Sequence, residues 1–155
     1  MTNSGHTTLH SRAAIVEAVH RSWWNVDREL GVGSELQFVE DGVCVMPALT
    51  MRGRSEIAEG YAKRQANGPR LSRHLVSNLV TATTNTDRAS ATYVLSLFAA
   101  NGVAPLEVTS PSAICDVEDR FVLTAGGWLI ESRRLTAVFV APGNDSVMLR
   151  GRGNR

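Results

Sequence analysis

Two residue types in this 155-residue chain are suited to moving a proton near neutral pH: the imidazole of His74 and the carboxylate of Asp27. An unperturbed histidine has a pKa of about 6.5, so it gains and loses a proton in this range. A carboxylate bonded to one ring nitrogen would fix the tautomer and stabilise the imidazolium that forms after proton abstraction. In an apolar pocket, such a pair could remove a proton next to a carbonyl or a leaving group, which would give elimination or isomerisation.

The local context of each residue, taken alone, favours a structural interpretation. His74 falls at the start of a strand-like segment, where a single histidine is usually a surface or capping residue. Asp27 falls late in a helix-like segment, where a carboxylate is usually solvated. The two residues become a candidate pair only if the fold brings these two segments together.

The segment that carries Asp27 has the pattern of an amphipathic helix. We expect this helix to begin near Thr8 or Ser11 and to end at Gly31 and Gly33. Its apolar residues recur at spacings of three and four: Ile15, Val19, Trp23, Val26 and Leu30.

Three shorter elements are expected next: a helix over residues 34–39, a strand over 42–49 and a helix over 55–65. Ser34 and Ser55 are the expected caps of the two helices. Pro47 interrupts the strand, and the Asn67-Gly68-Pro69 sequence ends the second helix.

Long extended segments make up the rest of the chain, and turn-forming sequences such as Asn101-Gly102 and Gly126-Gly127 separate them. The expected strands cover residues 74–84, 88–99, 112–124 and 128–140. Helices followed by an antiparallel meander predict an α+β fold. Strands this long require a sheet that curls strongly or bends at bulges. A curled sheet closed by helices would enclose a pocket.

Bulk composition is typical of one globular domain, with 43% hydrophobic and 20% charged residues and a net charge of +1. No basic stripe supports a nucleic-acid or acidic-membrane partner. With no apolar signal-like segment and no stretch of 18 apolar residues, we expect a soluble, cytoplasmic protein. The predicted domain covers residues 11–140, between a flexible N-terminus over 1–10 and a flexible or irregular tail over 141–155.

Neither a metal nor a cofactor is expected. Cys44 and Cys115 have no CxxC spacing and no paired histidine, so we interpret them as buried thiols in a reducing compartment. The glycines form turns, and no dinucleotide-binding loop or P-loop is present.

Several motifs, in this order and spacing, resemble the SnoaL-like domain family of the nuclear-transport-factor-2-like superfamily. They are the opening helix with Asp27, the Met51-Arg52-Gly53-Arg54-Ser55-Glu56-Ile57 turn, the segment over 72–78 and the closing hairpin over 126–134. The resemblance runs from about Ser11 to Val140. It implies a cone-shaped α+β barrel, in which N-terminal helices close a pocket on the concave face of a strongly curved, mostly antiparallel sheet.

Relatives in this superfamily include scytalone dehydratase, bile-acid dehydratases, hexachlorocyclohexane dehydrochlorinase, steroid isomerases and polyketide cyclases. The dehydratase and dehydrochlorinase subgroup keeps an aspartate late on the first helix and a histidine at the start of the strand after the helices. Asp27 and His74 occupy these two places, so the resemblance implies a catalytic His–Asp dyad. Ser22 stands where several dehydratases carry a tyrosine, and the lysine of the dehydrochlorinase type is also absent.

Helix spacing places His20, Trp23, Trp24 and Asp27 on one broad face. Trp23 and Trp24 are either core residues or a platform for a ligand. His20 is a competing base, but it lies two helical turns from Asp27, about 10.5 Å along the axis, and so cannot bond it directly.

Strand alternation predicts that Asn78 shares a face with His74, where its amide could bind a substrate oxygen or satisfy the backbone. Tyr93 could supply a phenol to the pocket or pack in the core. Arg133 and Asp119 belong to two charged segments that we expect to pair across an exposed face. One arginine could instead turn inward to hold an anionic oxygen. We expect no acidic residue in the strand interior.

Three functions remain open at this point. The first is a lyase or isomerase acting on a small hydrophobic, cyclic or polyketide-like substrate. The second is a non-catalytic ligand-binding or accessory protein, and the third is a polyketide cyclase. A homodimer or higher homo-oligomer is expected because a curved sheet leaves one broad surface to cover.

Overall fold

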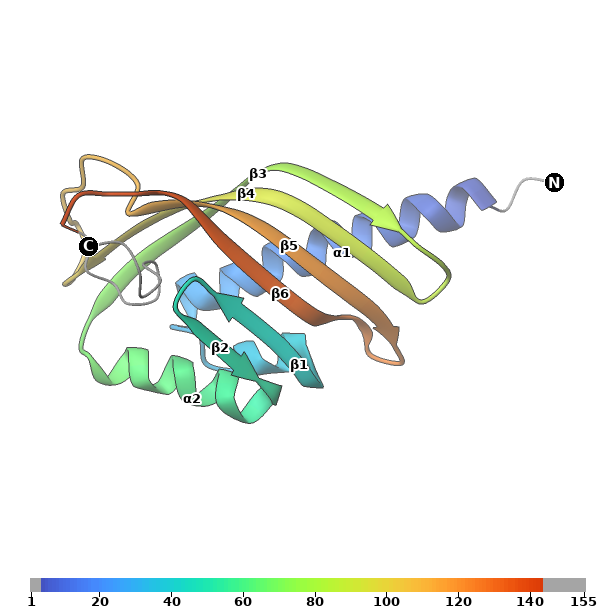
Figure 1. The fold of residues 1–155 in the computed structure, drawn as a ribbon, viewed down its shortest axis with the longest axis horizontal. Coiled ribbons are helices and arrows are strands. Elements are labelled where there is room, and N and C mark those ends of the chain that lie inside the picture. Colours follow the sequence, from blue (N-terminus) through green and yellow to red (C-terminus); the bar gives the residue numbers. More distant parts are fainter. Residues whose placement is uncertain (1–3, 144–155) are drawn as a thin grey trace.

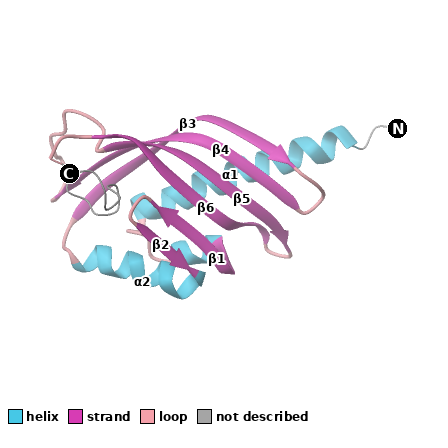
Figure 2. Cartoon of the chain, viewed as in Figure 1, coloured by secondary structure: helices cyan, strands magenta, loops and turns pink. Residues whose placement is uncertain are grey.

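The computed structural model describes residues 4–143 and, within them, the side chains from Ser11 onward. Two helices and a short 3₁₀ segment accompany six strands (Figure 1 and Figure 2). In chain order they are α1 (Ser4–Arg28), η1 (Ser34–Gln37), β1 (Phe38–Met46), β2 (Leu49–Arg52), α2 (Gly53–Ala66), β3 (Arg70–Thr83), β4 (Arg88–Asn101), β5 (Ala113–Thr124) and β6 (Gly127–Val140).

All six strands form one sheet in the order β2-β1-β6-β5-β4-β3. Neighbours pair antiparallel except β1 and β6, which run parallel. The sheet is open, because β2 and β3 are its edges. It curves around α1, while α2 lies beside the β1–β2 hairpin (Figure 1). The predicted α+β class and the curved, mostly antiparallel sheet are confirmed.

The four long strands lie where their sequence pattern placed them, with ends that differ by no more than four residues. Register shifts interrupt the pairing of β3 with β4 and of β5 with β6. A bulge lets a long strand bend and increases its twist. The long strands are therefore expected to bend at these register shifts.

The N-terminal part of the chain differs from its prediction at several boundaries. Helix α1 begins at Ser4 rather than near Thr8 or Ser11, so residues 4–10 are helical. The strand predicted over 42–49 is instead a hairpin, in which β1 and β2 pair on either side of a turn at Pro47 and Ala48. Of the tail expected over 141–155, residues 144–155 lie outside the described residues.

Neither predicted serine caps a helix. Ser34 is the first residue of η1, and its hydroxyl bonds the Asn25 side chain. Helix α2 begins at Gly53, two residues before Ser55, and the Glu56 carboxylate accepts a 2.7 Å hydrogen bond from the Arg52 backbone N–H. This acidic side chain satisfies a free donor at the helix start, where a serine was expected to do so.

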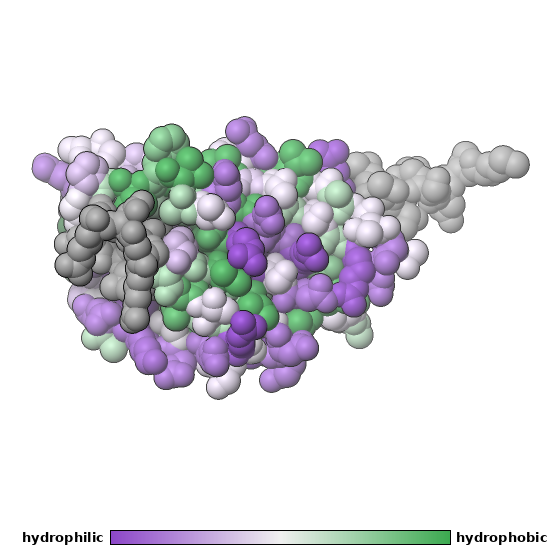
Figure 3. Space-filling model, in the orientation of Figure 1, coloured by the Kyte–Doolittle hydropathy of each residue, from purple (hydrophilic) through white to green (hydrophobic). Residues whose placement is uncertain are grey.

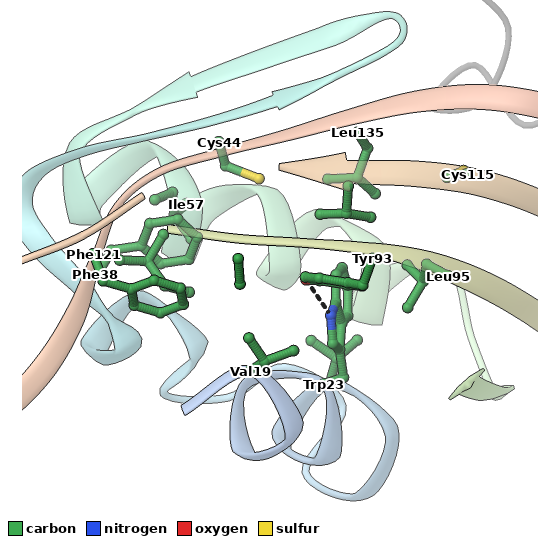
Figure 4. Packing of buried hydrophobic residues seen from close by; sticks show 14 of the residues in the cluster. Val19, Trp23, Phe38, Cys44, Ile57, Tyr93, Leu95, Cys115, Phe121 and Leu135 are labelled. Carbon is green, nitrogen blue, oxygen red and sulfur yellow. Dashed lines mark hydrogen bonds between the residues drawn. The ribbon is translucent and has the colours of Figure 1, made fainter. Parts of the chain in front are cut away.

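Buried side chains fill the space between the helices and the concave face of the sheet. Val19 and Trp23 of α1 point toward the sheet, where they meet Phe38, Tyr93 and other strand residues (Figure 4). Fully buried members from α2 and the central strands are Ile57, Leu95, Val117, Phe121 and Ile130. The concave face is thus occupied by a packed core.

Both cysteines are free and buried. Burial raises the pKa of the Cys44 thiol to about 11. Among the described helices, none is long and apolar enough to cross a membrane.

Candidate functional site

Asp27 and His74 lie in direct contact. The periodic apolar face of α1 packs against β3, which places the last turns of the helix beside the start of this strand. His74 Nδ1 lies 2.7 Å from Asp27 Oδ1. The two side chains are only 9% and 8% exposed, so this hydrogen bond is largely shielded from water.

Two further donors hold the Asp27 carboxylate in place, and a third supports one of them. The backbone N–H of His74 donates to Oδ2 at 2.7 Å, and the Ser72 hydroxyl donates to Oδ1 at 2.8 Å. Arg64 of α2 donates in turn to the Ser72 hydroxyl at 3.0 Å. Because β3 supplies both Ser72 and His74 at alternate positions, the extended backbone itself sets the geometry of the pair.

These contacts determine the protonation of the pair. Burial tends to raise the pKa of Asp27, but the hydrogen bonds and charge of His74 outweigh it, and the pKa lies below its ordinary value. Burial lowers the pKa of His74 and is opposed by the hydrogen bond and charge of Asp27. At neutral pH the carboxylate is therefore ionised and the imidazole neutral.

The tautomer of His74 follows from the same contacts. A carboxylate only accepts hydrogen bonds, so Nδ1 carries the proton and Nε2 has a lone pair. Within the described residues, no group hydrogen-bonds Nε2. No buried side-chain nitrogen among these residues lacks a partner, so Nε2 is accessible to solvent. A histidine in this arrangement can accept a proton at Nε2.

Trp23 separates His74 from a second polar cluster. Its indole stacks on the His74 ring, with centroids 4.6 Å apart and an interplanar angle of 17°. The Arg133 guanidinium lies 4.2 Å from the centroid of the indole ring. The indole N–H donates to the Tyr93 hydroxyl at 2.8 Å (Figure 4). Trp23 is therefore a core residue that also fixes the plane of the imidazole.

The second cluster is a buried ion pair between Asp119 and Arg133. Two guanidinium nitrogens of Arg133 bond the two carboxylate oxygens at 2.8 and 2.7 Å. Tyr93 donates to Asp119 at 2.9 Å, and the Ser22 hydroxyl accepts a bond from Arg133 at 2.8 Å. Burial raises the pKa of Tyr93 well above its ordinary value, so its phenol stays protonated.

This cluster corrects two expectations. Asp119 and Arg133 are opposed across β5 and β6, as cross-strand pairing predicted, but they face the core rather than solvent. An acidic residue therefore does lie in the strand interior. The signal was the alternation on β5, where every second residue is buried: Ala113, Cys115, Val117, Asp119 and Phe121. Arg133 turns inward, but its Nε and Nη2 donors are bonded to Asp119.

Two predicted substrate-binding residues have exposed side chains. Trp24 is 61% exposed and stacks under Arg28, because a helix rotates each successive side chain by about 100° and only Trp23 can face the sheet. Asn78 has a φ of 52° inside the bulge between Ser77 and Val80. The bulge breaks the two-residue alternation, and the Asn78 side chain is exposed.

A solvent-accessible cleft is lined by residues of the α2–β3 connection and by residues that directly follow β4. The α2–β3 connection lies at the left of the ribbon in Figure 1. Its volume is about 480 Å³, and its walls are Leu30 together with residues 64–65, 68–71 and 102–103. We call it the end cleft. Neither His74 nor Asp27 lines it, although Arg64 belongs both to its wall and to the hydrogen-bond chain that ends at Asp27.

Comparison with protein families identifies a match over most of the chain. The family model for the SnoaL-like domain matches residues 7–134. The protein belongs to the SnoaL-like family. Both members of the dyad, and Asp119 and Arg133 as well, fall inside the matched region of this SnoaL-like chain.

Solved structures share the fold of this SnoaL-like protein at low sequence identity. A protein of Novosphingobium aromaticivorans DSM 12444, named as a candidate scytalone dehydratase, is 17% identical with a TM-score of 0.79, over 97% of this chain and 99% of that one. ActVI-ORFA of Streptomyces coelicolor is 19% identical with a TM-score of 0.71, over 84% and 97%.

A third similar structure is a variant of Rv3472, a protein of unknown function from Mycobacterium tuberculosis. It is 21% identical with a TM-score of 0.75, over 91% of this chain and 79% of that one. No curated protein matches the sequence. At these identities the structural matches establish the fold, and the chemistry has to be argued from the site of this chain itself.

Proposed function

We propose that this SnoaL-like protein is a cofactor-independent lyase or isomerase in which His74 is the general base. Asp27 orients the imidazole and stabilises the imidazolium that forms when His74 takes a proton. The observation that carries the proposal is the 2.7 Å contact between His74 Nδ1 and the Asp27 carboxylate, which leaves Nε2 unprotonated and without a partner among the described residues. The substrate class is a small hydrophobic, cyclic or polyketide-like ketone with an acidic C–H bond.

The chemical step follows from this geometry. Nε2 of His74 takes the proton next to the carbonyl, and the ionised Asp27 stabilises the resulting imidazolium. In an elimination, the electron pair of the broken C–H bond forms the double bond while the hydroxyl group leaves from the next carbon. The His74 imidazolium gives its Nε2 proton to this leaving oxygen, which departs as water and restores the neutral base. In an isomerisation, His74 returns the proton to another carbon of the same enolate.

Ser22 does not replace the tyrosine that several dehydratases carry at this place. Its hydroxyl is buried, donates to the Val19 carbonyl at 2.7 Å and accepts from Arg133. Both interactions hold it in the core, away from any leaving group. The substrate class is therefore one whose leaving group departs without a tyrosine, such as a β-hydroxy ketone whose product is aromatic.

Proton abstraction can be tested separately from elimination. Exchange of the C2 protons of 1-tetralone in D₂O, followed by NMR, reports abstraction alone. Conversion of 3-hydroxy-1-tetralone to 1-naphthol reports loss of water as well. We expect the protein to accelerate both reactions, and His74→Gln and Asp27→Asn to lower the rates by about 10²–10⁴-fold.

The matched control is His20→Gln, which changes an exposed histidine of α1 and leaves both rates unchanged. Binding of the ketones without any catalysed exchange would contradict the proposal. Equal rates for the wild type and His74→Gln would contradict it as well.

A non-catalytic ligand-binding protein is the second candidate. The observation that favours it is the position of the end cleft, whose walls include neither member of the dyad. In that case the dyad would serve to anchor α1 to β3, and the tetralone assays would show binding without turnover. A polyketide cyclase would use the same base, and the assays separate it from a dehydratase only through the product that forms.

A homodimer remains part of the proposal. Figure 3 shows hydrophobic and hydrophilic side chains interspersed over the strand-bearing side of the molecule. The large apolar residues exposed on the long strands are Leu75, Val80, Leu123, Val138 and Phe139. A homodimer that packs along these strands would remove the exposed apolar side chains from water. Sedimentation velocity measures whether the protein dimerises.

A further inference from the structure

The end cleft combines two cationic groups that have no acidic partner among residues 4–143. Arg64 and Arg70 both line it. Arg64 donates to the Ser72 hydroxyl and Arg70 donates to the Asn101 side chain at 2.9 Å, and both acceptors are neutral. In the part of the chain that the structure describes, neither guanidinium forms an ion pair, whereas Lys63, which precedes Arg64 on α2, pairs with Glu59.

The two guanidinium groups also repel each other. Partial burial and the nearby charge of Arg64 together lower the pKa of Arg70. An anion placed between them would remove this repulsion. A guanidinium carries five N–H donors, so each arginine keeps donors free after its single bond to a neutral acceptor.

Apolar side chains form the rest of the cleft wall. Leu30 is 49% exposed and Val103 is 73% exposed, which are high values for large aliphatic residues. Pro69 and Leu71 continue the apolar wall between them. The cleft volume of about 480 Å³ lies within the range of small-molecule sites, roughly 300–1,000 Å³.

We propose that the end cleft binds an organic carboxylate with a compact hydrophobic body, whose carboxylate is held by Arg64 and Arg70 and whose body covers Leu30 and Val103. Arginine suits this role because its planar fork of donors matches a carboxylate in two parallel hydrogen bonds. The site is separate from the dyad and does not rest on the catalytic role proposed for His74. Its ligand nevertheless lies next to the chain of hydrogen bonds from Arg64 through Ser72 to Asp27.

The test uses 1-naphthoate and the neutral 1-naphthamide, which share one ring system and differ in charge. Each is titrated into ¹⁵N-labelled protein while the backbone amides of Gly68 and Gly102 are followed, because both glycines line the cleft. We expect naphthoate to shift these two amides saturably and naphthamide to bind at least 10-fold more weakly.

Arg64→Gln and Arg70→Gln should each weaken naphthoate binding by about 10-fold or more. Lys63→Gln removes a cation next to Arg64 that does not line the cleft, and it should change the affinity by less than about 2-fold. Arg70 is at the start of an edge strand, so its variant keeps the test valid even if Arg64→Gln unfolds. His74→Gln should leave the affinity unchanged, which separates this inference from the proposed catalysis.

Three results would overturn the inference. The first is equal affinity for naphthoate and naphthamide, and the second is an absence of saturable shifts at Gly68 and Gly102. The third is an equal loss of affinity in Lys63→Gln and in the two arginine variants. That result would show that naphthoate is attracted to a basic surface in general and not to a specific site.

Discussion

Two pairs of ionisable residues lie on either side of Trp23: Asp119 with Arg133, and Asp27 with His74. The two pairs differ in how their hydrogen-bonding groups are occupied. Asp119 receives two bonds from Arg133 and one from Tyr93, and both members of this pair are at most 3% exposed. Asp27 is equally well bonded, but its partner His74 keeps Nε2 free of any described hydrogen bond. An arginine stays charged, whereas a histidine titrates near neutral pH. The first pair can only support the structure, and the second can move a proton.

The largest expected difference between the two pairs is in stability. Asp119→Asn leaves Arg133 buried with an uncompensated charge, so we expect a loss of about 3–5 kcal/mol in the free energy of unfolding. Asp27→Asn faces a neutral histidine and keeps a side chain able to form hydrogen bonds, so the expected loss is about 1–3 kcal/mol. Urea denaturation of both variants measures the difference. Equal losses would show that the two pairs do not differ in this way.

Acidification near neutral pH should act on the dyad through His74. Because burial lowers the pKa of His74, the unfolded chain takes up a proton as the pH falls through about 6.5, while the folded protein resists it. Protons then favour the unfolded state, and the stability present above this pH is lost as the pH falls through the folded pKa.

Denaturation at pH 7.5 and pH 5.0 tests this prediction. The loss of stability should be smaller in His74→Gln than in the wild type, and His20→Gln should behave as the wild type. An equal loss in all three proteins would assign the acid sensitivity to other groups.

A smaller effect is expected where the two pairs meet. Trp23→Phe keeps an aromatic ring beside His74 but removes the N–H that donates to Tyr93. We expect a loss of about 1–2 kcal/mol in stability, with the exchange activity retained because the dyad contacts are unchanged. Loss of activity as complete as in His74→Gln would show that the indole, rather than Asp27, positions the imidazole.

The smallest effect is expected at Asn78, on the exposed bulge of β3. Glycine adopts its φ of 52° without strain, so Asn78→Gly should change the unfolding free energy by no more than about 0.5 kcal/mol. The tetralone rates should be unaltered. A marked loss of activity would place this amide back in a substrate site.

The sequence predicted the class of fold and the long strands well, because alternation over more than ten residues and glycine turns are strong local signals. It failed where one residue changes the geometry. The bulge at Asn78 reverses which residues face the core, and the short turn at Pro47 converts one expected strand into a hairpin. Neither feature leaves a clear periodic pattern.

The candidate site was predictable only in part. The contact between Asp27 and His74 was anticipated through the family resemblance, since two segments far apart in sequence give no local sign of meeting. Asp119 was detectable, because it occupies a buried position in the alternation of β5, but its charge favoured an exposed assignment. Burial of a carboxylate depends on a partner such as Arg133, and pairing is a property of the whole fold.

The most direct test of the account is the protonation state of His74, which requires no substrate. Long-range ¹H–¹⁵N NMR spectra of histidine-labelled protein, assigned with His74→Gln, distinguish the two neutral tautomers and follow the titration. We predict that at pH 7.5 His74 is neutral with its proton on Nδ1, and that its pKa is below 6.5. A proton on Nε2, or an imidazolium that persists above pH 7.5, would contradict the role of His74 as a base held by Asp27.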